Sequence, residues 1–267
     1  MVATSRMMRR EGRIRRFFGP PGSPRRLWFR SLPVLGPALV AAVTAFRRVR
    51  KSWEETMLSF QRARTDFKNR RAETAANITR RNTRRAYERV YGDDRLLSEY
   101  LAPGRVAFYT ELAEFAATQS PRSVIDVGCG AGNLLRAVVE KAGPERVVGI
   151  DYAAAGVRRA KELVPSGEFH AQSLYDVTTS ETFDLVLCTE VLEHLRDPET
   201  AVDLLVRLCA GSGTILITVP DGARDEWEGH RNFWSQAQLE DFLRPRGSVD
   251  VSRMYADPMS LLAVVRP

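Results

Sequence analysis

The clearest pattern of apolar and polar positions lies in the second half of the chain. Residues 123–127 (SVIDV) form a short run rich in β-branched side chains, and a cluster of glycines follows it directly. Residues 133–142 then place apolar side chains at helical spacing, and residues 146–150 (RVVGI) form a second β-rich run. The pattern predicts a strand, a glycine turn, a helix and another strand, in that order.

The segment before this domain is patterned as a helix. Residues 52–90 lack proline and glycine, and Trp53, Met57, Phe60 and Phe67 recur at helical spacing. We therefore expect one long helix that leads into the domain. Arginines are spread along the same segment, so this helix is basic.

Residues 31–46 form an uncharged, mostly apolar segment between arginines. The segment is short for a membrane span, and Pro33, Gly36 and Pro37 interrupt it. The arginine-rich residues before it show no period, so residues 1–51 are expected to be a basic, largely disordered extension. Such an extension can contact an anionic membrane surface peripherally, or it can pack on the domain or on a partner. Both interpretations stay open.

The charge divides the chain at the same place. Residues 1–89 carry 23 Lys and Arg against 6 Asp and Glu, whereas residues 90–267 carry 17 against 27, within a total net charge of +7. We therefore expect three parts, an extension (1–51), a basic helix (52–90) and one sizeable domain (91–267). Charge runs are most often solvated faces, and nucleic-acid motifs rich in aromatic residues are missing, so a nucleic-acid partner is not expected.

Three cysteines, Cys129, Cys188 and Cys209, show no CxxC spacing. This odd and sparse set excludes a disulfide framework and a zinc site built from cysteines. A cytoplasmic protein is the simplest expectation.

Acidic residues stand at the ends of the two predicted strands. Asp126 lies two residues before Gly128, where its carboxylate would repel a pyrophosphate, and Gly132 follows at a spacing shorter than the dinucleotide fingerprint requires. Asp151 ends the second strand, where a carboxylate suits the hydroxyl groups of a ribose. The pattern disfavours NAD and FAD. It favours a cofactor with a ribose and an amino group but no phosphate.

Three segments carry a resemblance to a known superfamily. VIDVGCGAGNLL and VVGIDYA resemble the first two motifs of the class I S-adenosylmethionine-dependent methyltransferases, and FDLVLCTEVLEHLRDPET is similar to their fourth-strand motif. The resemblance covers about residues 86–267 and implies S-adenosyl-L-methionine as the cofactor. It also implies an α/β, Rossmann-like fold, in which helices cover both faces of a mostly parallel seven-stranded sheet of order 3-2-1-4-5-7-6. The other strands are then expected at 168–171, 183–187, 213–219, 248–255 and 260–265.

The same resemblance assigns the cofactor contacts. The glycine loop would wrap the methionine part, Asp126 would orient its amino group, and Asp151 would bind the ribose. Arg105 resembles a contact to the cofactor carboxylate, and Ser173 stands where many relatives have an aspartate that binds the adenine amine. The implied cofactor residues are Arg105, Asp126, Gly128, Gly130, Gly132, Asp151, Tyr152, Ser173, Leu174, Thr189 and Glu190.

The chain looks closest to the ubiquinone-biosynthesis-type small-molecule O-methyltransferases, which share its CxExLEH run. Methyl transfer to a hydroxyl is an in-line displacement that needs a positioned oxygen and a base. His194 and His230 follow the fourth and fifth strands, where ligands of open α/β sheets gather, and they are the candidate catalytic residues. His194 can instead be a residue at a helix start that packs beneath the site.

A divalent metal is an open alternative at the same place. Glu190, Glu193 and His194 stand at i, i+3 and i+4, so they could share one helical face and meet His230 there. Some metal-assisted relatives carry this ExxEH run, but many metal-free relatives carry it too. We therefore expect no metal ligand.

Aromatic residues near these positions have two interpretations. Those of the loop after the fifth strand could line a flat acceptor or pin the helix expected at 235–243, and those of the leading helices could cover the cofactor or belong to the core. The residues concerned are Trp227, Phe233, Trp234, Tyr87, Tyr91 and Tyr109.

The sequence thus predicts an S-adenosylmethionine-dependent methyltransferase that acts on a hydroxyl of a small molecule, such as a phenol, a quinone precursor, a sugar or a natural product. Transfer to nitrogen or to an RNA ribose is the first alternative. A cofactor-binding scaffold without catalysis is the second.

Overall fold

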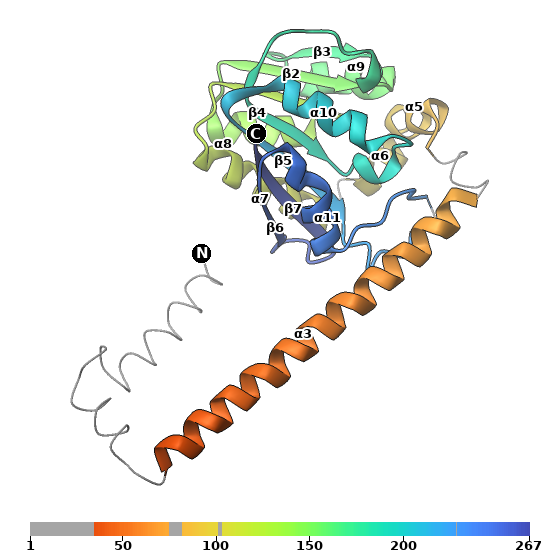
Figure 1. The fold of residues 1–267 in the computed structure, drawn as a ribbon. Coiled ribbons are helices and arrows are strands. Elements are labelled where there is room, and N and C mark those ends of the chain that lie inside the picture. Colours follow the sequence, from red (N-terminus) through yellow and green to blue (C-terminus); the bar gives the residue numbers. More distant parts are fainter. Residues whose placement is uncertain (1–34, 75–81, 101–102, 228) are drawn as a thin grey trace. The chain divides into compact units, whose positions relative to one another are not determined.

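The computed structural model describes residues 35–74, 82–100, 103–227 and 229–267. The chain divides into two units, Met1–Ser59 and Phe60–Pro267. The larger unit is an α/β domain in which helices lie on both faces of a sheet (Figure 1).

The sheet has seven strands in the order β3-β2-β1-β4-β5-β7-β6. β1 to β5 run parallel, whereas β7 is antiparallel to both β5 and β6. The predicted fold class and strand order are confirmed. The strands are β1 (Ser123–Val127), β2 (Arg146–Asp151), β3 (Glu168–Ala171), β4 (Phe183–Thr189), β5 (Cys209–Pro220), β6 (Ser248–Arg253) and β7 (Ser260–Arg266).

The helices pack as two layers around this sheet. The described helices of the domain are α5 (Arg84–Gly92), α6 (Asp94–Tyr100), α7 (Pro103–Thr118), α8 (Asn133–Ala142), α9 (Ala154–Leu163), α10 (Pro198–Leu208) and α11 (Gln236–Leu243), with short 3₁₀ turns η1 (Leu174–Asp176), η2 (Leu192–His194) and η3 (Arg244–Arg246). In β4, Leu185 and Leu187 join a core with α7, α8 and α9, whereas Val186 and Cys188 join a core with α10 and α11. Because both faces are covered, residues 185–188 of this strand form one continuous apolar run.

The parallel strands end at one edge of the sheet, and this edge positions the site. β1 leads into the glycine loop, β2 ends at Asp151, β4 leads into η2, and β5 leads into the loop before α11. Ligands of open α/β sheets bind at this carboxyl edge.

The helix expected at residues 52–90 is wrong in its bounds. The helix α3 spans Leu35–Thr74, and α5 is a separate helix. Thr83 caps α5, because its hydroxyl oxygen accepts a hydrogen bond from the backbone N–H of Ala86. Such an N-cap stabilises a new helix start without any proline or glycine nearby.

The disorder expected over residues 1–51 is wrong for residues 35–51, which belong to α3. Pro37 does not prevent this start because it lies in the first turn, where a backbone N–H has no partner within the helix. The expectations for residues 1–34 lie outside the described residues.

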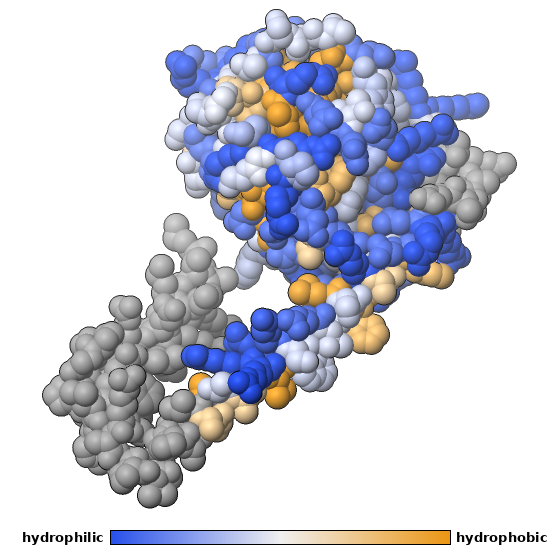
Figure 2. All heavy atoms as spheres, viewed as in Figure 1, coloured by the Kyte–Doolittle hydropathy of each residue, from blue (hydrophilic) through white to orange (hydrophobic). Residues whose placement is uncertain are grey.

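The described part of the smaller unit is the N-terminal portion of α3, which carries exposed apolar side chains. Phe46 and Trp53 are 69% and 65% exposed, and Figure 2 shows apolar and hydrophilic side chains together on this helix. Within the described ranges, none of the helices has the length and apolarity that a bilayer crossing needs. The peripheral membrane contact stays a prediction.

Removing residues 1–51 should leave the domain folded, because Arg62 and Thr65, through which α3 contacts the domain, lie beyond the deletion. We expect the Tm measured by calorimetry to change by less than about 2 °C. Sedimentation with anionic lipid vesicles should be lost together with the apolar and basic side chains of the extension. A Tm lower by about 10 °C would instead show that the extension belongs to the core.

Candidate active site

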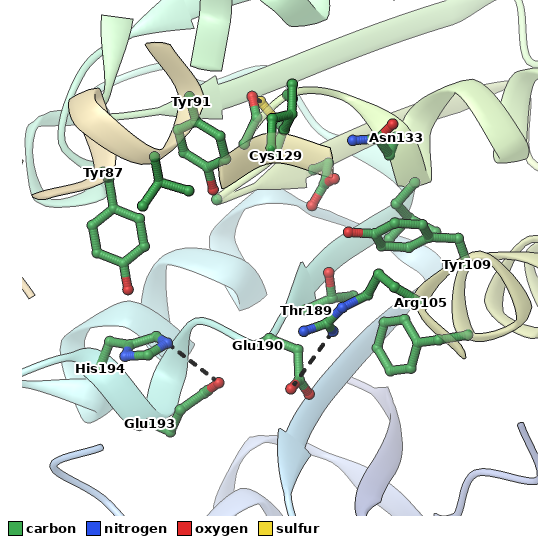
Figure 3. A pocket seen from close by; sticks show the side chains of 18 of the residues that line it. Tyr87, Tyr91, Arg105, Tyr109, Cys129, Asn133, Thr189, Glu190, Glu193 and His194 are labelled. Carbon is green, nitrogen blue, oxygen red and sulfur yellow. Dashed lines mark hydrogen bonds and ion pairs between the residues drawn. The ribbon is translucent and has the colours of Figure 1, made fainter. Parts of the chain in front are cut away.

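Two adjoining cavities lie at the carboxyl ends of β1, β2 and β4. The first has a volume of about 440 Å³ and the second of about 400 Å³. Tyr87, Tyr91, Gly128, Glu190 and His194 line both cavities, so the two share a wall. Figure 3 shows the first cavity, with the α5 tyrosines and the residues that follow β4 around it.

The loop after β1 requires glycine for two reasons. Gly128, Gly130 and Gly132 have φ values of +90°, +52° and +83°, which side chains of L-residues rarely adopt. A Cβ at Gly130 would lie only 2.6 Å from the Tyr91 hydroxyl oxygen. Glycine therefore allows the α5 ring to approach this backbone.

Asp126 presents a buried carboxyl group to the first cavity. Its side chain is 1% exposed, and Oδ1 has no hydrogen-bond partner among the described residues. Burial, with a smaller contribution from the nearby Asp151 carboxylate, raises the pKa of Asp126 to about 8. An ammonium group bound beside Asp126 would satisfy this oxygen and favour its ionised form.

Asp151 lines the second cavity, with Tyr152, Ser173 and Leu174. Its Oδ2 accepts a hydrogen bond from the Gly130 N–H at 3.0 Å, and its Oδ1 accepts one from the Ala153 N–H at 2.8 Å. Burial raises the pKa of Asp151 to about 6, although both backbone donors favour the carboxylate. Each carboxylate oxygen keeps a lone pair that can accept a ribose hydroxyl.

A cluster of one carboxyl group and two imidazoles also lines the first cavity. His194 Nε2 lies 3.6 Å and His230 Nε2 lies 4.0 Å from Glu193 Oε1. Glu193 is buried, and neither of its carboxyl oxygens has a hydrogen-bond partner in the described part of the chain. Glu193 and His194 belong to η2, whereas His230 comes from the loop after β5.

The other nitrogen of each imidazole is held by a neighbour. His230 Nδ1 lies 2.5 Å from the Asp225 carboxylate, and His194 Nδ1 lies 3.1 Å from the Asn82 side-chain oxygen. The Asn82 amide N–H donates to the Gly229 carbonyl, which leaves the amide oxygen for His194. Both contacts require a hydrogen on Nδ1, so both neutral imidazoles turn an Nε2 lone pair toward Glu193.

Three hydrogen-bond acceptors therefore meet at one point. Burial and then the charge of Glu190 hold the pKa of Glu193 well above its usual range, and burial lowers the pKa of His194 to about 3. At 3.6 and 4.0 Å, neither imidazole nitrogen is within hydrogen-bond distance of Glu193 Oε1. A divalent cation would satisfy all three ligand atoms, which lie within 4.8 Å of one another, and two imidazoles with one carboxylate suit such an ion.

Comparison with known proteins places this site in a family. Residues 97–252, more than half of the chain, match the model of the methyltransferase domain family. The chain belongs to this family. Its sheet order and motifs are those of the class I S-adenosylmethionine-dependent methyltransferases.

Two relatives and one solved structure show how far the likeness extends. The trans-aconitate 2-methyltransferase of Azoarcus sp. (strain BH72) is 32% identical over 98 residues, which are 37% of this chain and 39% of that protein. The ubiquinone biosynthesis O-methyltransferase of Methylococcus capsulatus is 36% identical over 104 residues, 36% of this chain and 43% of that one. The chain thus matches about two fifths of the length of these relatives.

The N-methyltransferase NodS from Bradyrhizobium japonicum WM9, solved with S-adenosyl-L-homocysteine, has a TM-score of 0.59 and 22% identity. The match covers 69% of this chain and 98% of that one. At this identity the likeness shows the fold of the methyltransferase domain.

The methyltransferase domain brings most of the predicted cofactor residues to the two cavities. Those lining the first are Arg105, Asp126, Gly128, Gly130, Thr189 and Glu190, and those lining the second include Asp151, Tyr152, Ser173 and Leu174. Gly132 lines neither cavity. A Cβ there would lie 2.9 Å from the Ala160 Cβ, so this glycine allows α8 and α9 to pack closely.

Arg105 and Glu190 face each other across the first cavity (Figure 3), with Arg105 Nη1 3.9 Å from Glu190 Oε2. Glu190 has a φ of +56°, so the chain is not helical there and the expected helical face with Glu193 does not form. Glu190 accordingly stays outside the three-residue metal cluster.

The structure distinguishes roles that the sequence left open for residues of the loop after β5. Trp227 and His230 line the first cavity, whereas Trp234 packs in the core beside Phe242. Asp221 is buried in an ion pair with Arg253 and does not line either cavity.

Sequence reasoning missed Asn82 and Asp225, the two residues that hold the imidazoles. Asp225 stands five residues before His230, and this spacing was the available signal. Asn82 gave none, since it stands 112 residues before the histidine that it contacts.

Asp126→Asn should stabilise the ligand-free domain at pH 8 and weaken cofactor binding. Because the folded pKa is raised, the stabilising contribution of Asp126 is complete below its ordinary pKa and is lost as the pH rises toward 8. At pH 8 we expect the Tm to rise by about 5 °C, and the Kd for S-adenosyl-L-methionine in calorimetry to rise at least about tenfold.

The matched control is Asp250→Asn, an exposed carboxylate on β6, which should change neither quantity. Unaltered cofactor affinity in Asp126→Asn would remove Asp126 from the cofactor site.

Proposed function

We propose that this chain transfers the methyl group of S-adenosyl-L-methionine to a hydroxyl group of a small molecule. The observation that carries the proposal is His230, whose Nδ1 is held by Asp225 and whose Nε2 lies in a cavity that adjoins the expected cofactor residues. The adenosine half of the cofactor fits the second cavity, with its ribose at Asp151. The amino group fits beside Asp126 in the first.

His230 is the proposed base. Its neutral imidazole accepts the hydroxyl proton at Nε2 while the hydroxyl oxygen attacks the methyl carbon and the bond from that carbon to the sulfonium sulfur breaks in line. Asp225 orients the ring and stabilises the imidazolium that forms, as the aspartate of a catalytic triad does. His194 is a poor base because burial lowers its pKa to about 3. It instead lines the shared wall of the two cavities.

The charges around the first cavity favour a hydroxyl over a carboxylate acceptor. Glu190 and Glu193 both line this cavity, and Arg105, the cation beside them, already faces Glu190. A carboxylate acceptor would compete with Glu190 for Arg105, and its methylation would need no base. Trp227 and Tyr109 offer flat apolar surface to a ring-shaped acceptor.

Methyl transfer can be tested with S-adenosyl-L-methionine labelled in its methyl group and separate panels of phenols, sugars, amines and carboxylic acids. We expect label in the hydroxyl compounds, and His230→Ala should lower kcat by about 10²-fold or more, the usual contribution of a base. His170→Ala is the control, because His170 is exposed on β3 beside Glu168. Label in amines or acids alone would refute the hydroxyl proposal, and cofactor binding without any label would favour a scaffold.

The cluster of Glu193, His194 and His230 also fits a divalent cation, the alternative that the sequence left open. Asp225 and Asn82 hold each imidazole with its Nε2 lone pair directed toward Glu193. Metal-bound histidines are usually held in the same way, by an acceptor that binds the N–H of the other ring nitrogen. A bound cation would act as a Lewis acid that lowers the pKa of an acceptor hydroxyl. His230 then serves as a ligand and not as the base, so the two uses of its Nε2 exclude each other.

The cofactor-free protein can be titrated with Mn²⁺, with binding measured by calorimetry and electron paramagnetic resonance. The result distinguishes His230 as a metal ligand from His230 as a base. If the cluster is a metal site, one ion binds per chain, and Glu193→Gln weakens it by about 10-fold to 100-fold. His170→Ala should bind as the wild type does. Absence of Mn²⁺ and Zn²⁺ binding would leave His230 as the base.

A further inference from the structure

The loop that carries His230 is held by α3, a helix outside the matched family region. α3 ends at Thr74, whereas the family match begins at residue 97. Residues from Phe60 onward nevertheless belong to the same unit as the methyltransferase domain. The C-terminal part of α3 contacts the loop after β5, which is described at 221–227 and 229–234.

Asn69 fixes the end of this loop through a paired hydrogen bond. Its side-chain N–H donates to the Phe233 carbonyl at 3.0 Å, and its side-chain oxygen accepts from the Phe233 N–H at 2.7 Å. Ala72, one turn further along α3, packs on the Phe233 side chain. Two complementary bonds from one amide fix both the position and the direction of the loop backbone.

Lys68 fixes the beginning of the same loop. Its ammonium group donates to the Gly222 carbonyl at 3.1 Å and to the Asp225 carbonyl, and it lies 3.6 Å from Glu226. The Lys68 side chain is only 15% exposed, so water replaces these contacts poorly. The two neighbouring residues Lys68 and Asn69 thus hold both ends of one loop.

Asp225 connects the Lys68 contact to the proposed base His230. Its backbone carbonyl accepts from Lys68, while its carboxylate binds His230 Nδ1 and also accepts from the Trp227 N–H at 3.0 Å. Lys68 therefore positions the residue that orients both the proposed base and an aromatic wall of the first cavity.

The other side of the loop is bound to η2. The N–H groups of Arg231 and Asn232 donate to the Glu193 carbonyl at 2.7 and 3.1 Å. His230 thus lies between two attachments, one to α3 through Asp225 and one to the residue whose carboxyl group it faces. A shift of the α3 attachment would move His230 relative to Glu193.

We propose that Lys68 and Asn69 are positioning residues of the acceptor site, and that the C-terminal part of α3 sets the place and tautomer of His230. This inference rests on the proposed function only in assigning His230 to the acceptor. A side chain displaced by about 1 Å can cost 10²-fold in rate, so loss of either attachment affects turnover although neither residue touches the acceptor.

The direct test is the ring state of His230 in the full chain labelled with ¹⁵N-histidine. The chain has three histidines, so their nitrogen signals can be assigned with His170→Ala and His230→Ala. In the wild type, His230 should show a protonated, strongly hydrogen-bonded Nδ1. In Lys68→Met and Asn69→Ala this signal should shift toward a mixture of tautomers, while the exposed His170 stays unchanged.

Two matched variants control this experiment. Arg70→Met removes an exposed charge from the same helix and should leave the His230 signal in place. Lys68→Arg keeps a cation that can donate to both carbonyls and should restore most of the wild-type signal. An unchanged His230 signal in both Lys68→Met and Asn69→Ala would overturn the inference.

Kinetics provide a second readout with the acceptor found in the labelling panels. Lys68→Met and Asn69→Ala should lower kcat/KM for the acceptor at least about tenfold, while the Kd for S-adenosyl-L-methionine changes less than about twofold. Equal losses of cofactor binding and turnover would indicate a general folding defect and contradict a positioning role.

The nuclear magnetic resonance result needs no turnover. A wild type without methyl transfer but with the expected His230 shifts would refute the proposed function and keep the inference. If Asn69→Ala fails to fold, Lys68→Met compared with Lys68→Arg tests the attachment to α3.

Discussion

The site depends on carboxyl groups that are buried without a hydrogen-bond partner among the described residues. Asp126 and Glu193 are each 1% exposed, and three of their four side-chain oxygens have no hydrogen-bond partner in the described residues. Burial raises the pKa of both groups, so the ligand-free fold favours their neutral forms. Groups of this kind are destabilising, and they persist only where the surrounding structure fixes them. Here the two-sided core around the sheet does so, and a cationic ligand at either place relieves the cost.

The parallel sheet explains why these groups lie close together. β1 and β4 are adjacent and run parallel, so Asp126 and the η2 residues that follow β4 emerge at the same edge. The glycine loop between them allows the Val191 and Tyr91 side chains to approach its backbone. As a result the first cavity has Asp126 near the loop and the cluster of Glu193, His194 and His230 at η2. One edge therefore offers a place for an ammonium group and a separate place for a proton acceptor or a cation.

The sequence predicted the site residues that stand at the end of a strand. Asp126 and Asp151 could be predicted, because a β-rich run fixes where its strand ends and parallel ends share an edge. The role of Asn82 could not, since it depends on where two segments far apart in the sequence meet. Asp225 had only its spacing of five residues from His230 as a signal. The single helix over 52–90 failed for a related reason: helical spacing continued through the region, and the Thr83 cap that starts α5 is a weak signal in a polar stretch. Trp227 and Trp234 are tryptophans of the same loop, and the sequence does not distinguish their roles. Only packing shows that Trp227 lines the cavity and that Trp234 belongs to the core.

The segments before residue 97 complete the site on both sides. In α5, the Glu88 carboxylate accepts from the backbone N–H groups of Ala154 and Ala155, each at 2.8 Å, at the start of α9. This contact keeps Tyr87 and Tyr91 against the shared wall of the two cavities. On the acceptor side, α3 holds the loop that carries His230. The matched region thus supplies the sheet edge at which the cofactor is expected, while the preceding helices shape the cavity where the acceptor would bind. Under the proposed function, acceptor choice therefore depends also on residues outside the region by which the family is identified.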